Sequence, residues 1–188
     1  SYQDLEGGHN FMVERGLPGR KRICCPTNLL RTFTQLQSYL YSRGTDGLWI
    51  HHYGGSTFKS TIANGQQIQL TQETDYPWDG KIKVKIDKLS SNKEFAVRVR
   101  IPGWAANSSV EVMVNGKEVK ETPKAGTYLS MIRKWKNGDI IELNLPMPVR
   151  LMEAHPKAEQ LRNQVAVMRG PVLYCLESKD LPEDKNIN

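Results

Sequence analysis

The sequence predicts a mainly β protein: an antiparallel β-sandwich preceded by a loop and one amphipathic helix. Two patterns lead to this prediction. From Gly47 onward, apolar and polar residues alternate in about ten short runs separated by turn residues, which is typical of strands with one buried and one solvated face. Before Gly47, only residues 26–42 repeat their apolar positions at helical spacing. A chain of 188 residues is long enough to bury one sizeable core.

The N-terminal part divides into a loop and a helix. Residues 1–23 show no sustained periodicity and are interrupted by glycines and a proline, so we expect a loop. Pro26 suits the first turn of the helix over 26–42, and Gly44 lies just past its end. The apolar positions of this helix are Leu29, Leu30, Phe33, Leu36, Leu40 and Tyr41. We expect this apolar face to pack on the sheets, or on partner helices outside this chain.

The strands follow one another at short intervals. The Asn115-Gly116 pair lies between two apolar runs and predicts a hairpin turn. We expect the sandwich over 47–177, after a segment 1–46 that holds the loop and the helix, and before a polar tail over 178–188. The predicted strands cover residues 48–53, 56–61, 67–74, 81–87, 95–101, 110–114, 118–120, 128–132, 140–145, 149–153, 165–168 and 172–176.

Composition and charge exclude several classes of partner. Hydrophobic residues make up 38% and charged residues 24% of the chain, as in an ordinary globular domain. The net charge of +6 could indicate nucleic-acid binding. However, the lysines and arginines are spread along the chain and alternate with apolar residues, which indicates solvated faces of strands. No apolar run approaches the roughly 20 residues that cross a bilayer. We therefore expect neither nucleic acid nor a membrane as partner.

The three cysteines are a poor framework for disulfides, because their number is odd and two of them are adjacent. Cys175 lies in an apolar run, so we expect it to be buried. Cys24 and Cys25 directly precede Pro26, at the predicted start of the helix. The positive end of a helix dipole stabilises a thiolate there, which is the reactive and metal-binding form of cysteine.

Several short motifs, in their order and spacing over residues 20 to 177, resemble one family, the β-L-arabinofuranosidase glycoside hydrolases (family 127, formerly a domain of unknown function). The segment from Tyr2 to Gly8 also resembles the stretch ahead of the family's double cysteine. The motifs are Cys24-Cys25-Pro26-Thr27-Asn28, Arg100-Ile101-Pro102-Gly103-Trp104, Val114-Asn115-Gly116, Lys134-Trp135 with Gly138-Asp139, and Arg169-Gly170-Pro171-Val172-Leu173-Tyr174.

The resemblance implies a fold and a reaction. In that family a helical toroid carries the catalytic cleft and β-sandwich domains follow it, so residues 1–46 would be the tail of the toroid. The implied reaction is a retaining hydrolysis in which a zinc-bound cysteine replaces the usual carboxylate nucleophile. By residue match, Cys24 resembles the nucleophile and Cys25 a second zinc ligand. The implied substrate is an L-arabinofuranoside or a related plant-type glycan.

Zinc is the cofactor that the resemblance implies for the intact enzyme. A catalytic zinc site uses about three protein ligands. The resemblance places the remaining ligands, a Glu and a Cys, upstream of this chain, together with the Glu that acts as acid and base. We therefore expect this chain alone to hold no zinc at Cys24 and Cys25, and to lack a complete active site.

Other candidate residues have weaker support. His9 lies in the loop ahead of the cysteines, where it could contact substrate in the intact enzyme. His51 and His52 fall in a predicted strand, so we expect their side chains to face opposite ways, one buried and hydrogen-bonded and the other exposed. Trp78 and Trp104 could stack on a sugar ring, although packing in the core or between domains accounts for them better.

Three hypotheses remain open for the function of the chain. It can be the C-terminal part of a glycoside hydrolase, a free-standing carbohydrate-binding sandwich, or an accessory sandwich that only supports the toroid. The missing N-terminal helical domain would be its main partner, and an exposed apolar helix face would favour self-association. The compartment stays open between the bacterial cytoplasm, the periplasm and secretion.

Overall fold

The computed structural model describes residues 24–62, 65–106 and 108–175, with the side chains described from Asn28 onward. The chain divides into two compact units, residues 1–39 and 40–188. The described residues contain the helix α2, the strands β1 to β13 and two short 3₁₀ turns, η1 (Gly103–Ala105) and η2 (Glu159–Leu161). No helix among these residues is long and apolar enough to cross a membrane.

The helix α2 spans Cys24–Leu40. The predicted helix is therefore confirmed, but its predicted end at residue 42 is wrong. Tyr41 begins a strand instead, because it pairs with Ile50 and stacks its ring on Phe58 at 4.5 Å between centroids. Long-range pairing and burial thus override the helical spacing of the apolar residues. Most apolar side chains of α2 are exposed, among them Leu29, Leu30, Phe33 and Leu36, whereas Leu40 at its end is partly buried.

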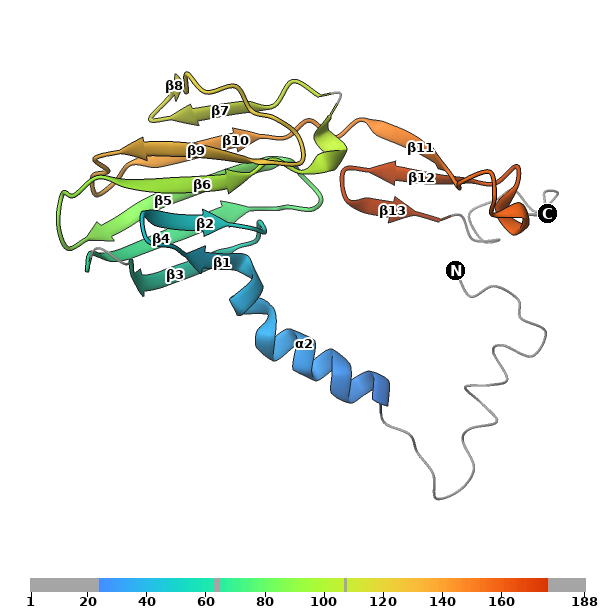
Figure 1. Cartoon of the computed structure of the whole chain (residues 1–188), viewed down its shortest axis with the longest axis horizontal. Coiled ribbons are helices and arrows are strands. Elements are labelled where there is room, and N and C mark those ends of the chain that lie inside the picture. Colours follow the sequence, from blue (N-terminus) through green and yellow to red (C-terminus); the bar gives the residue numbers. More distant parts are fainter. Residues whose placement is uncertain (1–23, 63–64, 107, 176–188) are drawn as a thin grey trace. The chain divides into compact units, whose positions relative to one another are not determined.

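One layer of the sandwich, which we call sheet A, has the order β1-β2-β6-β9 (Figure 1). Its strands are β1 (Tyr41–Arg43), β2 (Gly47–Ile50), β6 (Phe95–Arg100) and β9 (Tyr128–Arg133). The pairs β1–β2 and β6–β9 are antiparallel, whereas β2 and β6 run parallel. The parallel pair departs from the purely antiparallel sheet that we expect from the sequence. It arises because the chain builds three strands of the other layer between β2 and β6.

The second layer, sheet B, has the order β3-β4-β5-β10-β7-β8 and is antiparallel throughout. Its alternating residues follow the sequence pattern, with the lysines of β5 on the solvated side. At the predicted hairpin, Asn115 (φ 53°) and Gly116 (φ 73°) both adopt left-handed backbone, as a type I′ turn requires. The strands are β3 (Ser56–Thr61), β4 (Gln67–Thr74), β5 (Lys81–Leu89), β7 (Glu111–Val114), β8 (Lys117–Glu118) and β10 (Ile140–Asn144).

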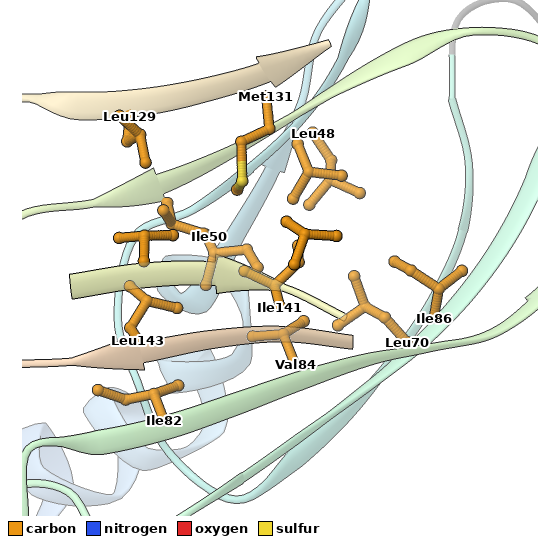
Figure 2. Packing of buried hydrophobic residues seen from close by; sticks show 14 of the residues in the cluster. Leu48, Ile50, Leu70, Ile82, Val84, Ile86, Leu129, Met131, Ile141 and Leu143 are labelled. Atoms are coloured by element: carbon orange, nitrogen blue, oxygen red, sulfur yellow. The ribbon is translucent and has the colours of Figure 1, made fainter. Parts of the chain in front are cut away.

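The core lies between the two sheets (Figure 2). Aliphatic side chains from both layers interdigitate there, including Leu48 and Ile50 of β2 against Val84 of β5 and Ile141 of β10. Trp135 is fully buried, and its Nε1 donates a hydrogen bond to the Phe95 carbonyl oxygen at 3.1 Å. The predicted sandwich is confirmed by this single core shared between sheets.

A third sheet follows the sandwich in the chain. It contains β11 (Val149–Glu153), β12 (Val165–Arg169) and β13 (Val172–Tyr174) in the order β11-β12-β13. Many of its apolar side chains are exposed; Leu151, for example, is 67% exposed. The expectation that Cys175 is buried is wrong: it lies just past β13 and is exposed. The division of the chain into domains at 46/47 and 177/178 stays a prediction.

Candidate functional site

The two adjacent cysteines open α2. Cys24 and Cys25 are its first two residues, and the first turn contains no acidic side chain. The backbone N–H groups of the first helical turn have no partner within the helix, so they favour a negative charge near them. The side chains of Cys24 and Cys25 lie outside the described part of the structure. The catalytic and metal-binding roles of these residues stay predictions.

The described residues do not supply a complete set of zinc ligands. Among the side chains described, those of 28–62, 65–106 and 108–175, no group of three or more His, Cys, Asp or Glu is arranged to hold a metal ion. A catalytic zinc needs about three protein ligands, so zinc at Cys24 and Cys25 requires ligands from other residues. His9, the predicted substrate contact, lies outside the described residues.

The two adjacent histidines follow β2 rather than extending it, because β2 ends at Ile50. The predicted strand over 48–53 is thus too long. His51 is half-buried and hydrogen-bonded, whereas His52 is exposed. The pKa of both imidazoles is lowered, first by burial and then by nearby positive charge, from His52 and Arg100 for His51 and from Arg100 for His52.

A chain of hydrogen bonds crosses the outer face of sheet A through His51. Its Nδ1 lies 2.5 Å from the Tyr128 hydroxyl on β9, and its Nε2 lies 2.7 Å from the Ser42 hydroxyl on β1. The His51 and Tyr128 rings meet edge to face at 5.6 Å. We call Tyr128, His51 and Ser42 the polar strap, because together they connect the two outermost strands of the sheet. Sequence reasoning missed this strap, since 77 residues separate His51 from Tyr128.

The tryptophans have separate environments. Trp104 is half-buried against the core, so the core-packing interpretation is confirmed for it. Trp78 is 66% exposed, and its backbone carbonyl accepts a hydrogen bond from Arg169. Trp49 lies under the Arg98 guanidinium, 4.1 Å from its ring centroid. Trp78 is therefore the tryptophan among these that offers an open ring to a ligand.

Two hollows of the described surface lie along sheet B. One groove of about 510 Å³ lies along β3, β4 and the end of β5, between Lys59, Gln69 and Lys88. A second, of about 400 Å³, lies on the solvated side of sheet B beside Lys83 and Glu142. Both are open grooves along strand faces that carry charged residues, so neither encloses a ligand as a small-molecule pocket does.

Comparison with known families divides the chain into two matched segments. Residues 47–147 match the family described as "Beta-L-arabinofuranosidase, GH127 middle domain". Residues 149–188 match the "Glycoside hydrolase family 127 C-terminal domain". The first segment covers the strands of sheets A and B from β2 onward, and the second begins with β11.

Individual glycoside hydrolases are also similar to this chain in sequence and in structure. The chain is 32% identical over 167 residues to the non-reducing end β-L-arabinofuranosidase of Bifidobacterium longum subsp. longum; the match covers 86% of this chain and 24% of that protein. A solved glycoside hydrolase superposes with a TM-score of 0.81 at 42% identity, over 89% of this chain and 27% of the other. The GH127 β-L-arabinofuranosidase Ara127N from Geobacillus stearothermophilus T6 superposes with a TM-score of 0.74 at 38% identity, over 81% and 24%.

The extent of these matches shows what the chain represents. It spans about a quarter of the length of the relatives that it matches. Within that span, the middle-domain match alone covers more than half of the chain. The chain belongs to glycoside hydrolase family 127, of which it carries the middle and C-terminal domain sequences.

Proposed function

We propose that this chain is the sandwich-bearing part of a β-L-arabinofuranosidase, and that hydrolysis requires groups outside it. One observation carries the proposal: two consecutive GH127 domain matches fill residues 47–188, while the relatives are about four times longer. The substrate class, a terminal β-L-arabinofuranoside, is named for the Bifidobacterium relative, and we extend it to the intact protein as part of the proposal.

In this proposal, the reactive thiol belongs to the first residue of α2. Cys24 stands at the helix start, where unpaired N–H groups lower the free energy of a thiolate relative to a thiol. A thiolate is a strong nucleophile toward an electrophilic carbon, so Cys24 is the proposed nucleophile and Cys25 the proposed zinc ligand. A catalytic zinc needs about three protein ligands, so the proposed zinc site of the intact enzyme needs ligands besides these two cysteines.

The sandwich itself has a supporting role. Its core is continuous between sheets A and B, and Leu40, the last residue of α2, packs against that core. The backbone oxygen of Leu40 also accepts a hydrogen bond from the His51 N–H at 2.8 Å. The last residue of the helix is therefore fixed to β1 and β2.

A chimeric enzyme tests this function. The matching region of the Bifidobacterium enzyme is replaced by this chain, and hydrolysis of an aryl β-L-arabinofuranoside is measured. We expect the chimera to be active, the Cys24→Ser chimera to lose activity by at least about a thousandfold, and the Cys175→Ser chimera to keep it. A folded chimera without activity, or an active Cys24→Ser chimera, would contradict the proposal. Circular dichroism and gel filtration establish folding in each case.

A further inference from the structure

Arg100 stands beside the polar strap on the outer face of sheet A. In the register of β6 and β9, Arg100 is directly opposite Tyr128. Side chains at opposed positions of neighbouring strands point to the same face of a sheet. Ile50 of β2 is opposite Val99 of β6, so His51 follows at the level of Arg100. Arg100, His51 and Tyr128 therefore form one row across this end of the sheet.

The Arg100 guanidinium has no partner within the described residues. It makes no hydrogen bond, ion pair or ring contact there, and the side chain is exposed. Every other described arginine has such a partner. The pairs are Arg31 with Asn28, Arg43 with the Thr61 carbonyl, Arg98 with Asp46, Arg133 with Trp135, Arg150 with the Gly170 carbonyl, Arg162 with Glu159, and Arg169 with the Trp78 carbonyl.

The surroundings of Arg100 are neutral or positive. Its positive charge acts to lower the pKa of four described side chains: His51, His52, Tyr53 and Tyr76. No acidic side chain is among the groups that shift these four pKa values. Tyr53 donates its hydroxyl to the Arg100 carbonyl, so that phenol is already committed. Among the residues that the structure describes, no carboxylate is thus found to offset the positive charge at this end of sheet A.

The solvated face of sheet B provides a contrast. Lys83 lies 3.8 Å from Glu73 and is directly opposite Glu142 in the register of β5 and β10. Charges of opposite sign alternate there, as on an ordinary solvated sheet. The row at Arg100 has donors and positive charge without carboxylates, which is the composition of an anion-binding surface.

We propose that Arg100, together with the polar strap, forms a binding site for a carboxylate, and that its ligand is an acidic sugar unit of a glycan. A guanidinium presents two parallel N–H donors that match the two oxygens of a carboxylate. The hydroxyls of Ser42 and Tyr128 add neutral hydrogen-bonding groups, as a sugar ring requires. The Tyr128 ring is 39% exposed and offers an apolar surface beside them.

Binding to the full 188-residue chain tests the site without any requirement for hydrolysis. The probes are D-galacturonate, acetate and L-arabinose, titrated at about pH 6.5 and low ionic strength while the imidazole signals of His51 and His52 are followed by NMR. Galacturonate and acetate share the carboxylate, whereas arabinose is a sugar without it. A bound anion favours the imidazolium form, so galacturonate should raise the pKa of both histidines.

The matched variants are Arg100→Gln and Lys85→Gln, which remove one positive charge each. Lys85 lies on β5 in sheet B and is exposed, so its loss changes the net charge but not the site. The Tyr53 bond goes to the Arg100 backbone and survives the substitution. We expect Arg100→Gln to weaken galacturonate binding at least about tenfold, and Lys85→Gln to change it less than about twofold.

The probes also separate the sources of the carboxylate. Tighter binding of galacturonate than of acetate assigns the ligand to an acidic sugar, and equal binding assigns it to a carboxylate without sugar contacts. Equal histidine shifts with arabinose and galacturonate, or equal binding by Arg100→Gln and Lys85→Gln, would overturn the carboxylate site. Either result leaves the proposed hydrolase function unaffected, because that function is tested in the chimera.

Discussion

Replacement of Trp135 by Phe tests whether the Lys134-Trp135 motif is structural. The Trp135 side chain is fully buried, and its Nε1 donates to the Phe95 carbonyl at 3.1 Å. Loss of this donor from a buried carbonyl costs about 1–3 kcal/mol. The smaller ring also leaves an unfilled volume near Phe95, which costs about 1 kcal/mol more. We therefore expect Trp135→Phe to lower the free energy of unfolding by about 2–4 kcal/mol.

The assay is urea unfolding followed by far-ultraviolet circular dichroism, because the substitution itself changes tryptophan fluorescence. The control is Trp78→Phe, since the Trp78 side chain is 66% exposed and its hydrogen bonds to Asp75 and Arg169 are made by its backbone N–H and carbonyl, which the substitution keeps. The control should change stability by no more than about 0.5 kcal/mol. A loss below about 1 kcal/mol for Trp135→Phe, or equal losses for the two variants, would refute the assignment of Trp135 to the core.

Three further predictions concern acidity, packing and thiol exposure. Since the pKa values of His51 and His52 are lowered in the folded chain, the unfolded chain binds more protons below about pH 6.5. The free energy of unfolding should therefore fall as the pH is lowered from about 7.5 to about 5.5. It should fall less in a His51→Gln, His52→Gln double variant. An equal fall in the original chain and in the variant would show that these histidines are not the cause. Gly47→Ala should lower the free energy of unfolding by at least about 2 kcal/mol in the same urea assay, because the added Cβ would meet the backbone carbonyl of Ala96. In the control Gly54→Ala, the added Cβ meets nothing within 4 Å, so its free energy of unfolding should not change. Similar losses for the two variants would contradict this packing. Cys175 should be alkylated in native buffer, as peptide mass spectrometry can show, because it is exposed; protection until denaturant is added would argue otherwise.

Much of the sandwich could be predicted from the sequence, because local patterns determine it. The alternation around Val84 and Ile86 places β5 with one buried and one solvated side, as the structure has it. Asn115-Gly116 forms the predicted turn because both residues tolerate the left-handed backbone that the hairpin needs. These features depend on neighbours in sequence, so one sequence was sufficient to predict them.

The features that could not be predicted depend on long-range contacts. Tyr41 fits the helical spacing, but its pairing with Ile50 and its stacking on Phe58 place it in β1. The polar strap joins Ser42 of β1, His51 just after β2 and Tyr128 of β9, which no local pattern reveals. Cys175 follows the apolar run of β13, yet it is exposed. An apolar run indicates a strand but does not show which of its faces has a neighbour.

The central claim is that this chain contributes the cysteine pair and the sandwich but not a complete active site. The most direct measurement is hydrolysis of an aryl β-L-arabinofuranoside by the chain alone in zinc-containing buffer, beside a Cys24→Ser, Cys25→Ser variant. The account predicts the same background rate for both proteins, because it proposes that the other groups of the site are supplied by residues outside this chain. Turnover by the chain that disappears in the double variant would contradict it and would show that the 188 residues complete the site themselves.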